Sequence, residues 1–187
     1  FVNTELRELS EPAVFNYVDF ITLDQGELPF LNILNFLHGE KNAGALTKTF
    51  LRLENEVAYY HDDTGNDLSP SETGCPDYSD LPLVRYLSLI EIANPMHRLW
   101  SDGLWNKLTV AHGCYWHRCA FCDTTLDYIK RYESSPAPLL VDRIEQVIAQ
   151  TGQTGFHFVD EAAPPAALKK LALELLRRKI SISWWTN

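Results

Sequence analysis

The sequence predicts an α/β protein in which parallel β/α units fill the carboxyl-terminal part and the end of a doubly wound domain precedes them. Between residues 107 and 185, three short strand-like apolar runs alternate with two amphipathic helical patterns. Strands joined through helices by short connections pair in parallel, and their right-handed crossovers begin either a barrel or an open doubly wound sheet. Nearer the amino terminus, a strand, a turn and a helix over residues 14–37 have the order expected of the last unit of a doubly wound domain.

The composition is that of a globular protein with enough apolar material for one or two cores. Of 187 residues, 45% are hydrophobic and 22% are charged, and the formal net charge is -9. This charge excludes a general attraction to nucleic acid or to an anionic membrane surface. No apolar run approaches the roughly 18 residues of a membrane-spanning helix, and the start lacks the pattern of a secretion signal. We therefore expect a cytoplasmic protein without a nucleic-acid or membrane partner.

Two strand regions and one helix are predicted in the front part. Residues 14–23 are rich in β-branched and aromatic side chains and predict a strand. Apolar residues at helical spacing predict a helix over residues 28–37. Apolar and polar residues alternate on either side of Glu54-Asn55, and this pattern predicts a small hairpin over residues 47–60.

A polar stretch rich in Asp, Gly, Ser, Pro and Thr separates this part from the rest. It covers residues 61–82 and has the composition of a linker. We therefore predict a first domain over residues 1–60, a linker and connecting segment over 61–105, and the β/α units over 106–187. The chain begins with Phe1 rather than Met and ends directly after a predicted strand, so we expect it to be a piece of a longer protein.

The β/α units are predicted element by element. Strands are expected over residues 107–111, 156–159 and 180–185, with one helix over 139–150 and a second that begins at Pro164-Pro165. The side chains expected to face the core are Leu140, Ile144, Val147 and Ile148 in the first helix, and Leu168, Leu171, Ala172, Leu175 and Leu176 in the second. On the middle strand, His157 alternates with two phenylalanines, and we assign it no role.

The segments that follow the three strands are expected to meet. The carboxyl ends of parallel strands lie at one edge of a sheet, which is where ligands bind in such folds. The long connection 112–137 leaves the first strand, Asp160-Glu161 leaves the second and residues 185–187 leave the third. A connection as long as the first is usually functional.

Three cysteines lie close together in that connection. Cys114, Cys119 and Cys122 are too near one another for a disulfide framework, which spreads its cysteines to join distant loops. They predict a metal site of one of two kinds. Three thiolates hold three corners of a [4Fe-4S] cluster and leave the fourth iron open. Alternatively, His117 completes a Cys3His zinc site in a zinc-stabilised binding module, although structural zinc usually takes its ligands from two separated knuckles.

The loop GCYWHRCAFCD, residues 113–123, resembles the radical S-adenosylmethionine (SAM) superfamily. The resemblance rests on the three cysteines, on Phe121 just before the last of them, and on the position of the loop after the first strand of a β/α series. The usual motif is C-x3-C-x2-C, whereas this chain has C-x4-C-x2-C. The specific part of the resemblance covers residues 107–187, which would supply three strands of a six-stranded partial, TIM-like barrel.

This resemblance implies a function and its cofactors. Cys114, Cys119 and Cys122 would hold a [4Fe-4S] cluster whose open iron chelates SAM. One electron, from a reductant such as flavodoxin or ferredoxin, would cleave SAM to methionine and a 5'-deoxyadenosyl radical, which starts radical chemistry on a substrate that the resemblance does not identify. Phe121 would lie near the adenine, and Asp160 and Glu161 would contact the methionyl ammonium. The alternative role of these two acids is to cap the helix that follows.

The front of the chain resembles the closing part of the Rossmann-like cobalamin-binding domain found in one branch of this superfamily. The likeness lies in the acidic Gly-Glu turn at residues 24–27. It implies an oxidoreductase or a methyltransferase-like enzyme with cobalamin as a further cofactor. The histidine motif that would hold the cobalt, D-x-H-x-x-G, does not occur in these 187 residues.

Overall fold

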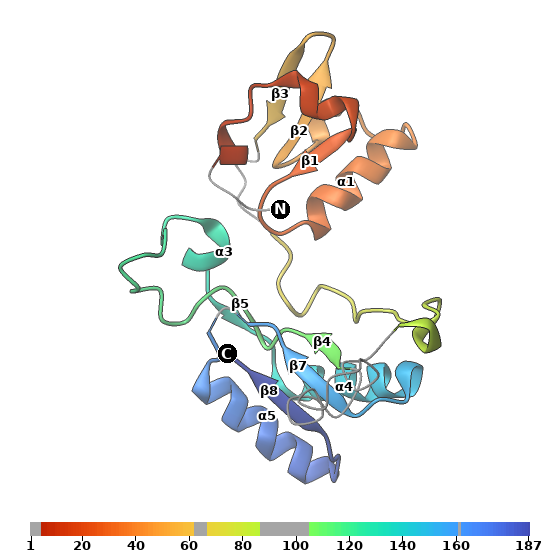
Figure 1. Ribbon diagram of the computed structural model, residues 1–187, viewed down its shortest axis with the longest axis vertical. Helices are drawn as coiled ribbons and strands as arrows, with labels where there is room; N and C mark the ends of the chain where they lie inside the picture. Colours follow the sequence, from red (N-terminus) through yellow and green to blue (C-terminus); the bar gives the residue numbers. More distant parts are fainter. Residues whose placement is uncertain (1–4, 62–66, 87–104, 161) are drawn as a thin grey trace, which may run out of the picture. The chain divides into compact units, whose positions relative to one another are not determined.

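The computed structural model describes residues 5–61, 67–86, 105–160 and 162–187. The chain divides into two compact units, Phe1–Leu68 and Ser69–Asn187, which are described one at a time (Figure 1).

The first unit is a small antiparallel sheet with one α-helix. Its strands β1 (Phe20–Thr22), β2 (Thr49–Leu53) and β3 (Glu56–Tyr60) pair in the order β1-β2-β3. The helix α1 (Glu27–Leu37) follows β1, and the 3-10 helices are η1 (Glu5–Glu8), η2 (Pro12–Asn16) and η3 (Ala43–Ala45). Ile33, Leu46 and Leu51 form its buried core.

The predicted helix and hairpin of this unit are confirmed, but the predicted strand is wrong over its first half. Residues 12–16 form η2 because Pro12 fixes a helical backbone angle at its start, and the Glu11 carboxylate accepts a hydrogen bond from the Ala13 nitrogen (2.9 Å). The strand that remains, β1, pairs antiparallel with β2. The described part of this unit has no parallel strand pair, so the structure does not confirm a doubly wound domain here.

The second unit contains the predicted parallel sheet. Its strands β4 (Asn106–Leu108), β7 (Gly155–Phe158) and β8 (Ser183–Thr186) pair in parallel in the order β4-β7-β8. The helices α4 (Ala137–Thr151) and α5 (Pro165–Arg178) connect them. The other elements among the described residues are η4 (Leu83–Arg85), β5 (Ala111–His112), α3 (Asp127–Lys130) and β6 (Glu133–Ser134). The parallel β/α arrangement is therefore confirmed, and closure into a barrel stays a prediction.

Both long helices pack against the same face of this sheet. Phe156 and Phe158 of β7 are fully buried beneath Leu140, Ile144 and Val147 of α4 and Leu171 and Leu175 of α5. The predicted inward faces are confirmed apart from Leu176, whose side chain is 73% exposed. Each residue turns about 100° around a helix, so the position after Leu175 lies outside the buried stripe.

The predicted strand 107–111 is two strands in the structure. β4 ends at Leu108, the chain bends at Val110, and β5 then pairs antiparallel with β6 in a separate two-stranded sheet. The bend turns the start of the cysteine-containing connection away from the parallel sheet. The two-stranded sheet of β5 and β6 therefore lies at the base of that connection.

The segment at the start of this unit is tied to α4. Arg143, a buried residue of α4, donates hydrogen bonds to the carbonyl oxygens of Pro70 (2.6 Å) and Thr73. The Cys75 thiol lies 3.7 Å from the carbonyl oxygen of Arg143, and burial is the main cause that raises its pKa. Cys75 is therefore a partly buried thiol at the edge of the hydrophobic core. It lies far in the sequence from the other three cysteines.

Candidate functional site

The site is built at the carboxyl ends of β4 and β7. Asp160, two residues beyond the end of β7, is 3% exposed. Its carboxylate accepts hydrogen bonds from the backbone nitrogens of Val110 (3.0 Å) and Ala111 (2.7 Å). A buried carboxylate shared by two backbone N–H groups fixes the bend between β4 and β5.

The third strand end reaches the same edge. The Ala163 nitrogen donates to the carbonyl oxygen of Asn187 (3.0 Å), and the Val159 nitrogen donates to that of Leu108 (2.9 Å). The predicted meeting of the three strand ends is therefore visible in these backbone contacts.

The bonds of Asp160 to Val110 and Ala111 leave its predicted contact with the methionyl ammonium a prediction, and they differ from the alternative role of capping α5. The cap of α5 is Pro164, which makes no side-chain hydrogen bond to the helix. The bonds to Val110 and Ala111 instead hold the root of the cysteine loop. Glu161, the other predicted ligand of the methionyl ammonium, lies outside the described residues.

The cysteine loop is closed at its base by backbone contacts. After β5, Gly113 takes a left-handed backbone angle (φ 74°), which glycine adopts at little cost. The Cys114 nitrogen then donates to the carbonyl oxygen of Ile129, a buried residue of α3 (3.4 Å). The Ser135 nitrogen donates to the carbonyl oxygen of Val110 (2.9 Å) on the other side. Residues 114–126, which carry all three cysteines, form no helix or strand between these fixed ends.

The three thiols are partly buried and none forms a disulfide. The Cys114 sulfur accepts a hydrogen bond from the His117 nitrogen (3.3 Å), and the Cys122 nitrogen donates to the carbonyl oxygen of Cys119 (3.2 Å). The thiolate is the form of cysteine that binds metal. In the part of the chain that the structure describes, no three His, Cys, Asp or Glu side chains are gathered as metal ligands. The donor set nevertheless fits a [4Fe-4S] cluster, because its ligands are thiolates and the loop supplies three of them between fixed ends.

The cysteine loop carries several exposed aromatic side chains. Phe121, predicted to lie near the adenine, is 92% exposed, and Trp116 is 53% exposed. The guanidinium of Arg118 lies 6.0 Å from the centre of the Trp116 ring, and the rings of Tyr115 and Tyr132 meet edge to face at 6.5 Å. Phe121 is therefore accessible to solvent, and its predicted position near the adenine stays a prediction.

Sequence reasoning missed the backbone amides of Val110 and Ala111 as part of the site. Their side chains are buried and apolar, and it is their N–H groups that Asp160 binds. An apolar residue that acts through its backbone leaves no signal in residue type. The only available signal was the acidic residue after the middle strand.

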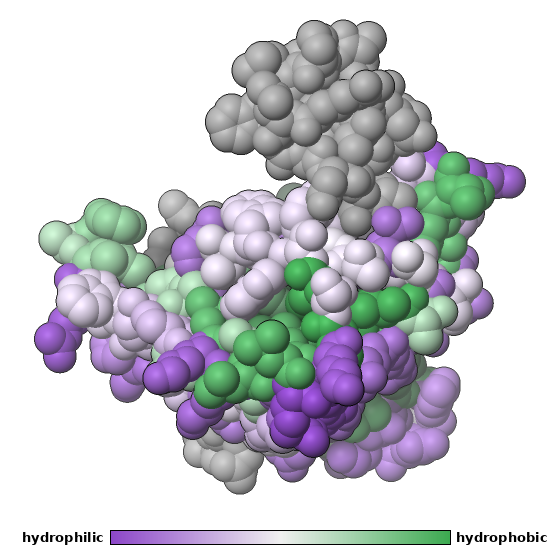
Figure 2. All heavy atoms as spheres, turned by 90° about the horizontal axis from the view of Figure 1, so that it is seen from below, coloured by the Kyte–Doolittle hydropathy of each residue, from purple (hydrophilic) through white to green (hydrophobic). Residues whose placement is uncertain are grey.

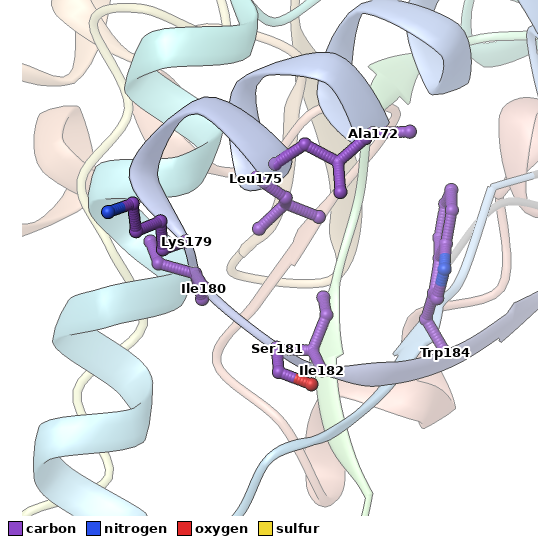
Figure 3. Close-up of a pocket in the computed structure, with 8 residues that line it drawn as sticks. Ala172, Leu175, Lys179, Ile180, Ser181, Ile182 and Trp184 are labelled. Carbon is purple, nitrogen blue, oxygen red and sulfur yellow. The ribbon is translucent and has the colours of Figure 1, made fainter.

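A separate apolar hollow lies at the opposite end of the sheet. It has a volume of about 590 Å³ and is bounded by Ala172 and Leu175 of α5 and by Ile182 and Trp184 at the start of β8 (Figure 3). Viewed from below, apolar side chains are exposed between hydrophilic ones (Figure 2), and exposed leucines on α5 include Leu173. This hollow lies at the amino-terminal end of β8, so it is distinct from the cysteine loop.

Comparison with known proteins yields one structural likeness and no sequence family. No family model matches the chain, and no curated protein is similar to it. The chain resembles the structure of apo, selenomethionine-labelled OxsB, a cobalamin-dependent S-adenosylmethionine radical enzyme, with a TM-score of 0.57 and 14% sequence identity. The match covers 92% of this chain and 23% of OxsB, so the chain spans less than a quarter of that protein.

At this identity the likeness shows a shared fold. It agrees with the mixed α/β structure and the parallel strands of the second unit. Among the described residues, no helix has both the length and the apolar character needed to cross a membrane.

Proposed function

We propose that the chain is part of a radical SAM iron-sulfur enzyme, in which Cys114, Cys119 and Cys122 hold a [4Fe-4S] cluster and SAM is reductively cleaved to start radical chemistry. One observation carries the proposal. The cysteine loop leaves the carboxyl end of β4, and Asp160 from the neighbouring strand holds its root at the edge where such sheets bind ligands. The shared fold with OxsB, a cobalamin-dependent S-adenosylmethionine radical enzyme, supports it.

The chain's own residues would act in distinct ways. When bound, the cluster supplies an open iron for SAM and the electron that cleaves it. Three thiolates would hold the other irons, and the His117 N–H would stabilise the negative charge on the Cys114 sulfur. Phe121, exposed on the same loop, would stack on the adenine. Asp160 is a positioning residue that fixes where the loop begins.

Two parts of the proposal rest on the sequence resemblance alone. Contact of Asp160 and Glu161 with the methionyl ammonium stays a prediction, as does reduction by a flavodoxin or a ferredoxin. Cobalamin belongs to the proposal for the whole protein, because OxsB is described as cobalamin-dependent. We assign no cobalamin-binding residues here, since the cobalt-binding histidine motif is absent from these 187 residues.

A zinc-stabilised binding module is the second candidate, and one contact favours it. The Nδ1 atom of His117 lies 3.0 Å from the carbonyl oxygen of Cys114. If Nδ1 carries the proton and donates it there, Nε2 keeps its lone pair for a metal, as in many zinc sites. Zinc would then stabilise a closed loop without leaving an open coordination position.

Anaerobic reconstitution with iron and sulfide separates the two candidates. The iron-sulfur proposal predicts a brown protein with about four irons and matching acid-labile sulfide per chain. Stoichiometric zinc that survives dialysis, with no sulfide bound, would support the zinc module and contradict the iron-sulfur proposal. Cys119→Ala should lose the cluster, whereas Cys75→Ala, which removes a thiol outside the loop, should keep it. A cluster that persists in Cys119→Ala would show that the ligand assignment is wrong.

A further inference from the structure

Three side chains form a row across the parallel sheet, on the face opposite α4 and α5. Lys107 of β4 is the register partner of His157 of β7, which is the register partner of Trp185 of β8. The neighbouring strand residues Phe156 and Phe158 point to the helix-covered face and are buried there. Since side chains alternate along a strand, the row lies on the other face.

The three side chains are in direct contact. The Lys107 Nζ atom lies 2.7 Å from Nδ1 of His157. The imidazole ring of His157 stacks on the indole ring of Trp185, with centroids 3.7 Å apart and planes inclined by 10°. The row is thus an ordered unit in which each member fixes the next.

The contact with Lys107 determines how the imidazole presents its protons. An ammonium has donors and no acceptor, so Nδ1 of His157 must accept and the ring proton of a neutral imidazole sits on Nε2. Burial first, and the charge of Lys107 second, hold the pKa of His157 below its usual value, which favours this neutral form. The Nε2 atom is buried and has no hydrogen-bond partner among the described residues. A buried donor without an acceptor costs free energy until a ligand or water supplies one.

The row therefore offers hydrogen-bond donors and one positive charge. The Lys107 ammonium keeps two further protons, His157 has Nε2–H, and the Trp185 indole has only a donor. The other strand positions on this face, Gly155 and Ser183, carry no charge, so no described strand residue there contributes a carboxylate. In a chain of net charge -9, this is a local concentration of positive potential.

The row also lies close to the carboxyl ends of its three strands. Lys107, His157 and Trp185 are each the last residue but one of their strands, which end at Leu108, Phe158 and Thr186. Those ends form the edge from which the cysteine loop departs. A small molecule held by the row would therefore lie at the edge of the sheet from which the cysteine loop departs.

We propose that Lys107, His157 and Trp185 bind an anionic group, a carboxylate or a phosphate, of the enzyme's substrate. The Lys107 ammonium would form the ion pair, His157 Nε2–H would donate a hydrogen bond, and Trp185, which is 46% exposed, would pack against the body of the ligand. Anion binding follows from the row alone, and its assignment to the substrate rests on the proposed radical SAM function.

The test uses the whole 187-residue chain in buffer of low ionic strength, where ion pairs are least screened. Benzoate and inorganic phosphate are the anionic probes, benzylammonium reverses the charge, and methionine carries the amino-acid part of SAM. Binding is followed by the NMR signals of the His157 ring and by tryptophan fluorescence. We expect saturable binding of at least one anion, with matching changes at His157, and none of benzylammonium.

Variants separate the row from non-specific attraction. Lys107→Met should weaken anion binding by about tenfold through loss of the charged donor. Lys107→Arg keeps the charge and should retain most of the binding. This result would show that the weaker binding of Lys107→Met does not come from a folding defect. Lys170→Met removes the same charge from an exposed position on α5 and should leave binding unchanged.

Four results would overturn the proposal. They are no saturable binding of either anion, equal binding of benzylammonium, equal effects of Lys107→Met and Lys170→Met, and tighter binding of methionine than of either anion. The last would assign the row to SAM rather than to the substrate. Because the probes require no cluster, failure here is distinguishable from failure to assemble iron and sulfide.

Discussion

The carboxylate of Asp160 lies 2.7 Å from the backbone nitrogen of Ala111, a residue that precedes it by 49 positions. The same carboxylate also binds the Val110 nitrogen at 3.0 Å. The end of β7 thereby holds the bend at which the chain leaves the parallel sheet for the cysteine loop. This contact links the sheet to the thiols, because Cys114 follows Ala111 by only three residues.

Replacing this carboxylate tests its role. Asp160→Asn keeps the size of the side chain but leaves one oxygen for two backbone donors and turns an amide N–H₂ toward the bend. We expect the free energy of unfolding to fall by about 1–3 kcal/mol, measured by urea denaturation, because a buried donor loses its acceptor. The matched control is Asp80→Asn, at an exposed position of the same unit.

A positioning role also has a spectroscopic consequence. The loop of Asp160→Asn would be displaced relative to the sheet, so the folded, reconstituted variant should show a changed response of its cluster to SAM. Equal stability of Asp160→Asn and wild type, together with an unchanged cluster spectrum, would contradict this role.

The imidazole of His157 provides a pH-dependent prediction. Its pKa is lowered, first by burial and then by Lys107, so the folded chain resists a proton that the unfolded chain accepts below about pH 6.5. The contribution of this group to stability is therefore lost as the pH falls below 6.5 through the folded-state pKa. NMR titration should give His157 a pKa below 6.5, and Lys107→Met should raise it. A value at or above 6.5 in the wild type would show that the row does not form as described.

Charged side chains at the end of α5 predict that the stability of the second unit falls in acid. Hydrogen bonds from Arg177 and Arg178 lower the pKa of Glu174 to about 2, and Arg178 also bonds Asp142 and Glu145 of α4. A carboxylate with a lowered pKa contributes stability above its unfolded pKa near 4.5, and this contribution is lost as the pH falls toward 2. Urea midpoints measured between pH 5 and pH 2.5 should therefore fall less steeply in Glu174→Gln than in wild type. Parallel curves for the two proteins would rule out this source of acid sensitivity.

The sequence predicted the elements whose apolar residues are periodic. Helix α4 and the two buried phenylalanines of β7 were identifiable because a long helix and an alternating strand each bury one face. The parallel pairing followed from the order of those elements. In β8, Trp184 packs against Phe158 and Trp185 against His157, as the alternation of side chains along a strand requires.

What the sequence did not predict depends on contacts between distant residues or on backbone angles. The division of one strand into β4 and β5 results from a bend held by Asp160, which the residues at the bend do not reveal. A proline converted part of another predicted strand into η2. The closed base of the cysteine loop likewise depends on a hydrogen bond between Cys114 and Ile129, which are not neighbours in the sequence.

The proposed function requires that Cys114, Cys119 and Cys122 leave one iron of a [4Fe-4S] cluster open to SAM. Its most direct test is the electron paramagnetic resonance spectrum of the anaerobically reconstituted, reduced chain, recorded with and without SAM. The proposal predicts the signal of a reduced [4Fe-4S] cluster whose g values change when SAM is added, while buffer without SAM leaves them unchanged. A cluster signal that SAM does not alter, or a chain that assembles no cluster, would contradict it.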